Sequence, residues 1–146
     1  MDNTSRVTTA LRECHLKVTK HRVNVLKILI RAQKPLSADA IYHLLMTDRQ
    51  SIDLSTIYRI LETLAEKELV IKVTFENEVK NLYEYNHQIH HHFLICLSCN
   101  QITKVESCPL RDYEELVSEK MKFRVIGHKL EFYGYCEDCQ KKQKYS

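Results

Sequence analysis

Two pairs of cysteines with the spacing Cys-x-x-Cys constrain the fold of this chain more than any other feature. The pairs are Cys96 with Cys99 and Cys136 with Cys139, and about 40 positions separate them. A Cys-x-x-Cys loop places two thiolates about one tetrahedral edge apart, and two such loops complete a closed zinc site with Zn–S distances near ~2.3 Å. Because four sulfur ligands leave no open position, we expect a structural zinc ion here.

Redox-active cysteines and plain buried thiols are the other interpretations of these motifs. A redox protein needs one such pair beside a helix N-terminus, whereas this chain has two pairs far apart. The sequence shows no signal-like apolar segment at its start and no run approaching the roughly 20 apolar residues that span a bilayer. We therefore expect a cytoplasmic protein with no membrane partner, whose reduced thiols favour a metal site.

Two of the six cysteines fall outside these pairs. Cys14 lies on the apolar stripe of an expected helix, so we expect it in the core. Cys108 has no such context, and its role as a metal ligand stays open at this point.

Apolar residues recur at helical spacing in the first half of the chain. Helices are expected near residues 7–14 and 19–30, a third is N-capped by Ser37 and ends near Met46, and a fourth follows Asp53. The segments VIKVTFE and NLYEY then contain β-branched and aromatic residues on either side of a polar turn, which is typical of a hairpin. Short helices followed by a hairpin predict a winged helix-turn-helix domain.

Beyond residue 86 the sequence changes to histidines, cysteines and two strand-like segments, HHFLICL and KLEFYGY. One helix is expected at about residues 109–121, with four apolar side chains facing inward. These side chains are Leu110, Tyr113, Leu116 and Val117. Because 146 residues are enough for two small domains, we expect an α+β protein with domains at residues 1–85 and 86–146.

Five stretches, taken in order, resemble the ferric uptake regulator (Fur) family of metal-sensing bacterial repressors. They are KVTKHR, LSTIYRIL, HHHFLICLSC, KVESCPL and GHKLEFYGYCEDC. The histidine run, ESCPL and GHKLEFYG look most like the zinc uptake regulator (Zur) branch. The resemblance implies a homodimer with an N-terminal winged helix that binds operator DNA and a C-terminal α/β dimerisation domain. It also implies a second, regulatory metal ion, expected to be zinc.

The resemblance makes the helix after Asp53 the recognition helix, which lies in the major groove. Tyr58 and Arg59 match the family's Tyr-Arg pair. Ser55 and Thr56 at the helix start are expected to donate hydrogen bonds to phosphate oxygens. A buried core position is the alternative for Tyr58.

Lys17 and Arg22 match basic family positions that reach the DNA backbone. A solvated helix face is the alternative for both, and a structural pairing within the domain is a further alternative for Arg22. The net charge of +3 is too small to indicate a nucleic-acid partner by itself.

Histidine is the commonest ligand for a metal that must come and go at neutral pH. Five of the eight histidines lie beyond residue 86. Alternate residues of a strand share a face, so His90 and His92 can bind one ion while His91 points elsewhere. The family pattern assigns His90, His92 and His128 to one site, and Glu84 with His91 to another.

The fourth ligand of the His90 site is open among Glu106, Asp112, Cys108 and water. His87 is a candidate to replace a missing ligand beside Glu84 in the other site.

The chain departs from the family pattern at several ligand positions. Phe93 stands where relatives have a histidine of the sensing site, and its ring has no donor atom. Pro35 also replaces a histidine, and Lys104 and Arg111 stand where others carry carboxylates. We therefore expect the site of His90, His92 and His128 to be the regulatory one.

The predicted function is zinc-responsive repression of metal uptake genes, and we do not expect an enzyme. The iron-sensing and peroxide-sensing branches of the same family are the near alternatives. A zinc hydrolase is the alternative from another class, with three histidine ligands and one water. It lacks an evident general base and a His-Glu-x-x-His motif.

Overall fold

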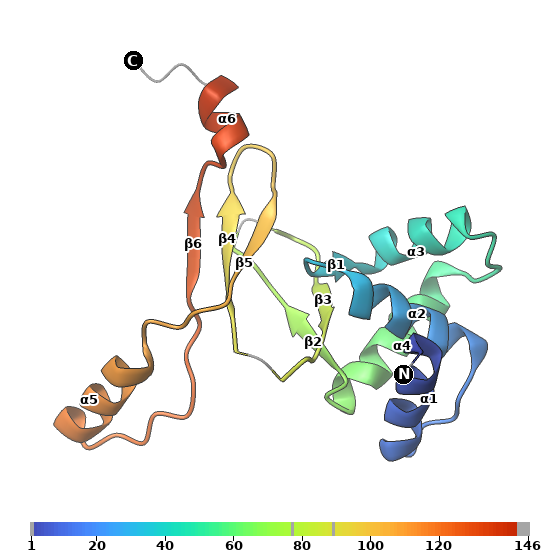
Figure 1. Ribbon diagram of the computed structural model, residues 1–146, viewed down its shortest axis with the longest axis horizontal. Coiled ribbons are helices and arrows are strands. Elements are labelled where there is room, and N and C mark those ends of the chain that lie inside the picture. Colours follow the sequence, from blue (N-terminus) through green and yellow to red (C-terminus); the bar gives the residue numbers. More distant parts are fainter. Residues whose placement is uncertain (1, 77, 89, 143–146) are drawn as a thin grey trace. The chain divides into compact units, whose positions relative to one another are not determined.

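The computed structural model describes residues 2–76, 78–88 and 90–142, and it forms two compact units (Figure 1). The first unit is Met1–His87 and the second is Gln88–Ser146. No helix in the described part of the chain is both long and apolar enough to cross a bilayer.

Four helices dominate the first unit, as the apolar spacing predicted. They are α1 (Asn3–Glu13), α2 (Lys20–Arg31), α3 (Ala38–Thr47) and α4 (Leu54–Glu66). The last three begin where a side chain caps the helix, because each cap satisfies a backbone N–H that has no partner within the helix. The oxygens of Thr19, Ser37 and Asp53 accept from the N–H three residues later, at 3.2, 3.1 and 2.8 Å.

A three-stranded antiparallel sheet completes the first unit. It consists of β1 (Leu36–Ser37), β2 (Val70–Val73) and β3 (Leu82–Tyr85) in the order β1-β3-β2. The hairpin β2–β3 confirms the prediction from sequence, whereas the two-residue strand β1 was too short to be recognised. Four helices with this hairpin make a winged helix-turn-helix unit.

A polar cluster joins the β2–β3 hairpin, which is the wing of this unit, to helix α4. The hydroxyl of the buried Tyr83 on β3 donates to Glu62 Oε1 of α4 at 3.1 Å. Lys72 of β2 forms an ion pair with the same oxygen at 2.9 Å. Burial of Tyr83 and its bond to Glu62 raise the pKa of this phenol to about 12, so it remains a donor at neutral pH.

One hydrophobic core holds the first unit together. Its fifteen buried members come from all four helices, the loop before α4 and the hairpin. Cys14 is not among them, because α1 ends at Glu13 and leaves the thiol half-buried near the carbonyl of Lys67. The expectation of a core position for Cys14 is therefore wrong.

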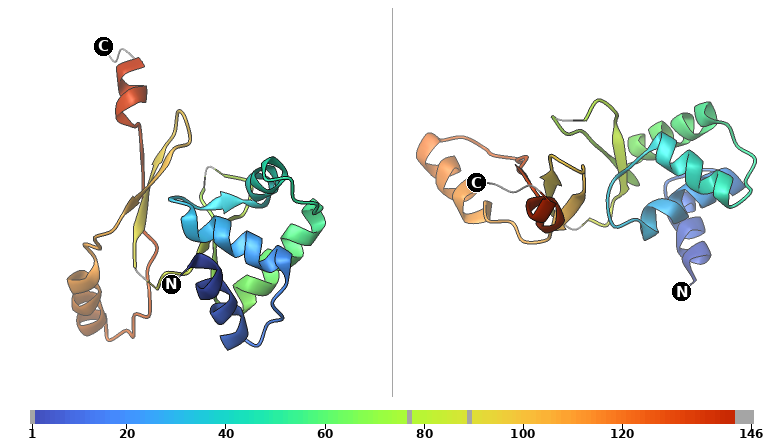
Figure 2. Two further views of the ribbon diagram at one scale, coloured as in Figure 1. Left: turned by 45° about the vertical axis from the view of Figure 1, so that its right-hand side comes forward. Right: turned by 90° about the horizontal axis from the view of Figure 1, so that it is seen from above.

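The second unit is a small mixed sheet with two helices (Figures 1 and 2). Its strands are β4 (His92–Cys96), β5 (Ile102–Val105) and β6 (Glu131–Gly134), in the order β5-β4-β6. Strand β4 pairs antiparallel with β5 and parallel with β6. Strands β4 and β6 were predicted. Strand β5 and the terminal helix α6 (Glu137–Lys142) were not.

Helix α5 (Arg111–Met121) follows the predicted range but not the predicted burial. It buries none of its side chains, and Tyr113 and Leu116 are 59% and 54% exposed. In both further views the helix stands apart from the three strands of its unit (Figure 2). The inward orientation expected for Tyr113 and Leu116 is therefore wrong within a single chain, because none of the described elements of this unit buries them.

The cap of α3 yields a test of the first unit. Replacing Ser37 with alanine removes the acceptor for the Ala40 N–H, and we expect a loss of about 1 kcal/mol in the free energy of unfolding. Chemical denaturation followed by circular dichroism measures this loss. Ser51→Ala, at an exposed serine outside any helix, is the control. Equal stability of the two variants would contradict the cap.

Candidate metal centres and nucleic-acid interface

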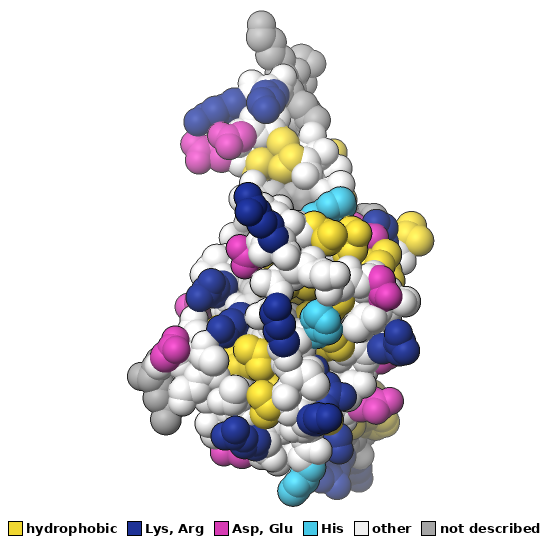
Figure 3. Space-filling model, turned by 90° about the vertical axis from the view of Figure 1, so that its right-hand side faces the viewer, with side chains coloured by type: hydrophobic (Ala, Val, Ile, Leu, Met, Phe, Trp, Pro, Cys, Tyr) yellow, Lys and Arg dark blue, Asp and Glu magenta, His cyan; other side chains and the backbone are white. Residues whose placement is uncertain are grey.

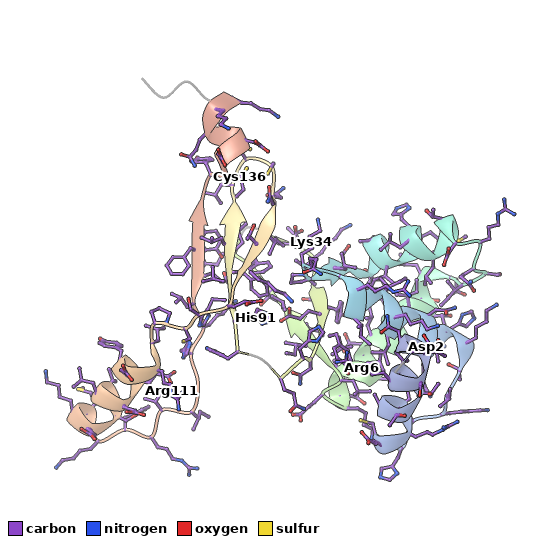
Figure 4. All side chains as sticks on the ribbon, viewed as in Figure 1. Asp2, Arg6, Lys34, His91, Arg111 and Cys136 are labelled. Carbon is purple, nitrogen blue, oxygen red and sulfur yellow. The ribbon has the colours of Figure 1, made fainter. Side chains whose placement is uncertain are left out.

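Four cysteines meet at one end of the second sheet. Cys96 ends β4 and Cys99 lies in the following turn, while Cys136 follows β6 and Cys139 lies in α6. Parallel pairing places Cys96 opposite Gly134, so both Cys-x-x-Cys loops leave the sheet at the same edge. Figure 4 shows Cys136 at this edge, between β6 and α6. The four sulfur atoms all lie within 4.8 Å of one another.

The backbone around this cluster favours a thiolate at Cys96. The N–H groups of Cys99 and Cys136 donate toward the Cys96 sulfur, the latter at 3.4 Å, and lower the pKa of Cys96 to about 6. The Cys99 and Cys136 sulfurs lie 3.8 Å apart. Thiolates this close repel each other unless a cation lies between them, and four sulfur donors suit a tetrahedral metal ion.

A second cluster lies near the opposite ends of the same strands. His90 precedes β4, His92 begins it, Cys108 lies between β5 and α5, and His128 precedes β6. The donor atoms of all four lie within 4.8 Å of one another. The structure thus brings together the three histidines that the sequence selected, and it adds Cys108 as the fourth donor.

The distances within this cluster fit a tetrahedral ion. The Nε2 atom of His128 lies 3.0 Å from Nε2 of His90, 3.1 Å from Nε2 of His92 and 3.3 Å from Cys108 Sγ. The Cys108 sulfur lies 3.2 Å from Nε2 of His92. A tetrahedral ion bound at its usual Zn–N and Zn–S distances has ligand separations of about 3.3 to 3.8 Å. Only a small expansion is needed to admit it.

The charge state of His92 also suits a metal ligand. Its side chain is buried, and this burial, together with the neighbouring His90 and His128, lowers the pKa of the imidazole. A neutral imidazole is the form that binds metals.

Strand geometry separates His91 from this cluster, as predicted. The ring of His91 packs edge-on against Phe93 at 5.0 Å between centroids, while His90 and His92 share the other face. His91 and Phe93 therefore mark the side of β4 away from the four donors.

The other candidates for a fourth ligand stay outside the group of donors. Glu106 is exposed and lines the same cavity as His90 and Cys108, but its carboxylate is not in the group. Asp112 is exposed on α5. The cavity also contains Arg111, which Figure 4 shows at the start of α5.

The residues predicted for the other metal site belong to different units. Glu84 is buried on β3 and His87 is half-buried, both in the first unit. His91 belongs to the second unit. A shared site for Glu84 and His91 therefore remains a prediction.

Helix α4 presents the expected DNA-binding side chains at its N-terminal part. Arg59 is exposed and Tyr58 is 42% exposed, so the alternative of a buried core tyrosine is wrong. The hydroxyl of Ser55 donates to Asp53 Oδ1 at 2.9 Å, and the N–H of Thr56 donates to the same oxygen. Bonds from Thr56 and then Ser55 lower the pKa of Asp53 to about 2. Asp53 is therefore ionised at neutral pH, and its carboxylate caps the N-terminus of α4.

The two basic residues before α2 and within it differ in their surroundings. Lys17 is exposed, whereas Arg22 is half-buried and donates from Nη1 to the Lys17 carbonyl at 2.9 Å. Arg22 thus makes the structural pairing, and this bond shapes the loop that carries Lys17. The face of the first unit seen in Figure 3 carries many Lys and Arg side chains beside fewer acidic ones, which suits a phosphate backbone.

Comparison with known proteins agrees with this arrangement. The model of the ferric uptake regulator family matches residues 13–133. The ferric uptake regulation protein of Bacillus subtilis is 31% identical over 141 residues, which cover 94% of this chain and 95% of that protein. The peroxide-responsive repressor PerR of Staphylococcus aureus is 30% identical over 133 residues, with coverage of 91% and 88%.

A solved structure shows the same likeness. The Helicobacter pylori ferric uptake regulator, described as having three functional metal binding sites, has a TM-score of 0.79 and 25% identity. The match covers 94% of this chain and 91% of that one. The family consists of regulators rather than enzymes, which decides against the zinc hydrolase. This chain belongs to the ferric uptake regulator family of metal-responsive transcriptional regulators, whose members bind operator DNA as dimers.

Proposed function

We propose that this protein is a zinc-responsive repressor that binds operator DNA as a homodimer and controls metal uptake genes. The observation that carries the proposal is the cluster of three imidazole nitrogens and one thiol at His90, His92, Cys108 and His128. Such a set is a tetrahedral site that binds metal reversibly through histidine.

The ligand chemistry favours zinc over iron or manganese. A thiolate is a soft ligand, and four nitrogen and sulfur donors in a tetrahedron match the preference of Zn²⁺. Manganese prefers oxygen ligands in octahedral geometry. Relatives of this chain include proteins named for ferric uptake regulation and for peroxide response, so iron is the second candidate.

The four cysteines hold a structural zinc ion in this proposal, one per chain. All four ligands are sulfur, so the ion has no position for a substrate or exchangeable water. Its role is to join the turn after β4 to helix α6.

DNA binding belongs to residues 1–85, and metal binding with dimerisation belongs to residues 86–146. Helix α4 enters the major groove, with Tyr58 and Arg59 toward the DNA and Thr56 near the phosphates. The hydroxyl of Ser55 bonds to Asp53 at the start of this helix. Lys17 binds the DNA backbone from a loop that is held by the hydrogen bond from Arg22 to the Lys17 carbonyl. The protein works in the cytoplasm, where a bacterial operator lies.

Metal binding reaches the DNA-binding unit through the short segment that joins the two units. His90 lies just after the last residue of the first unit, His87, so a metal at His90 and His92 restrains the chain where the second unit begins. A metal ion can shift DNA affinity only by the difference between its affinities for the DNA-binding arrangement of the protein and for the arrangement that does not bind DNA.

Cys96→Ser tests the structural ion. We expect the loss of one zinc per chain and a marked loss of stability in the second unit, because metal binding supplies folding free energy in small domains. Metal analysis of the dialysed protein and thermal unfolding measure the two effects. Cys14→Ser removes a thiol outside both clusters and is the control. Unchanged zinc content in Cys96→Ser would contradict the site.

Arg59→Ala tests the DNA-binding surface. We expect operator affinity to fall by about 1 to 3 kcal/mol if Arg59 contacts a base, with zinc content unchanged. Arg124→Ala removes an equal charge from an exposed position in the second unit and controls for net charge. Fluorescence anisotropy at fixed salt provides the affinities. Equal losses in both variants would mean that only overall charge matters.

A titration of free zinc against operator binding tests the proposed function. The dimer with filled cysteine sites should gain about 5- to 150-fold in affinity, which is the usual range of such coupling. His92→Ala should abolish the gain while leaving the metal-free affinity unchanged. Glu106 lines the same cavity but is not one of the four donor residues, so Glu106→Gln should keep the gain in affinity. A gain produced by Fe²⁺ but not by zinc would replace the zinc assignment with iron, and no gain with any metal would overturn the proposal.

A further inference from the structure

The ring of His128 has contacts on both of its nitrogens. Its Nε2 atom faces His90, His92 and Cys108. Its Nδ1 atom contacts Glu114 Oε1, from the first turn of helix α5. Both side chains are largely shielded, with exposures of 17% for His128 and 28% for Glu114. No ligand spacing in the sequence connects Glu114 to His128, so sequence patterns do not predict this contact.

The contact determines how His128 can act as a ligand. When Nε2 binds a metal ion, the ring proton is on Nδ1, and that N–H donates to the Glu114 carboxylate. A carboxylate in this position fixes the tautomer and the plane of the ring, and it makes the imidazole a stronger donor to the metal. His92 is oriented differently, because its ring bonds to the backbone carbonyl of Leu130.

We propose that Glu114 is a positioning residue of the regulatory metal site. It acts through His128 and raises the affinity of the site for a divalent cation. This inference rests on the proposed function, since it requires that the cluster of His90, His92, Cys108 and His128 binds metal.

The local chain places Glu114 where it can serve this role. Cys108 and Glu114 lie on the same short segment, the first before α5 and the second within its first turn. The N–H of Glu114 donates to the Leu110 carbonyl at 2.7 Å, which fixes the start of the helix. This segment therefore contacts His128 twice, with the thiol of Cys108 near Nε2 and the carboxylate at Nδ1.

The neighbouring glutamate offers a matched control. Glu115 is the next residue of α5 and is exposed. It is absent from the group of donors and from the lining of the cavity beside them. Glu115→Gln therefore removes the same charge from the same helix without touching His128.

The test measures metal binding in the full-length dimer with its cysteine sites filled. Chelator competition gives the zinc affinity of the second site for the wild type, Glu114→Gln, Glu115→Gln, His128→Ala and the double variant Glu114→Gln with His128→Ala. We expect Glu114→Gln to weaken zinc binding about 10- to 100-fold, which is typical when the partner of a ligating histidine is lost. Glu115→Gln should bind like the wild type.

The double variant shows whether Glu114 acts through His128. If it does, the double variant binds zinc as weakly as His128→Ala alone, because the two losses are not additive. A spectrum with saturating Co²⁺ is the second readout. Glu114→Gln should keep the charge-transfer absorption of the Cys108 thiolate, since all four ligands still bind.

Several results would overturn the inference. Equal zinc affinity of Glu114→Gln and the wild type would remove any role for this carboxylate. A further loss in the double variant, or a missing thiolate absorption in Glu114→Gln, would show that Glu114 supports the fold of the segment instead of the imidazole. Failure of the wild type to bind a second zinc ion would overturn the proposed function and the inference together, and the wild-type titration alone distinguishes that case.

Discussion

No apolar cluster comparable to the core of the first unit forms among residues 88 and 90–142, and most of the architecture of the second unit depends on this constraint. The cluster of fully buried apolar residues lies between Val7 and Tyr83, within the first unit. Among the described residues of the second unit, burial is confined to strand β4 and Cys139. A unit of about 60 residues is marginally stable even with a good core, and small domains commonly rely on bound metals or on a partner subunit. The two clusters of side chains that could hold metal ions both lie in this unit, where apolar packing is scarce.

The two clusters occupy opposite ends of one pair of strands. Strands β4 and β6 are parallel, so their first residues lie at one edge and their last residues at the other. His92 begins β4 and Cys96 ends it, a distance of about 13 Å along an extended chain. The structural ion proposed for the cysteines would fix how β6 lies beside β4, and the same alignment of the strands brings His128 to His92. Under the proposed function, the structural metal site would therefore help to form the regulatory one.

Sequence reasoning succeeds where the determinants are local. The caps at Thr19, Ser37 and Asp53 act within one turn, and the Cys-x-x-Cys spacing defines a metal site over four residues. The alternation of His90, His91 and His92 likewise follows from strand geometry alone. These patterns predicted helices α1 to α5, the β2–β3 hairpin and three of the four donors of the histidine cluster.

Features that depend on tertiary structure were missed. Strand β5 has only four residues and takes its order from pairing with β4. The contact of Glu114 with His128 depends on a chain reversal that no spacing in the sequence encodes, and for the same reason Cys108 was only one of four candidates for the fourth donor. Helical periodicity predicts that the apolar stripe of α5 faces the interior of the domain. It identifies an apolar face, however, without identifying what covers that face. A second subunit is the kind of cover that such a face requires.

Helix α5 lies within a loop whose two ends both supply donors to one cluster. Cys108 precedes the helix and His128 follows it, and the helix itself buries no side chain. An ion bound by both residues closes this loop like a cross-link. For a covalent link across about 20 residues, the entropy removed from the open chain corresponds to roughly 3 kcal/mol. A cation at this position therefore acts on the chain as a reversible counterpart of a disulfide bond, and its departure returns conformational freedom to the whole segment between the two ligands.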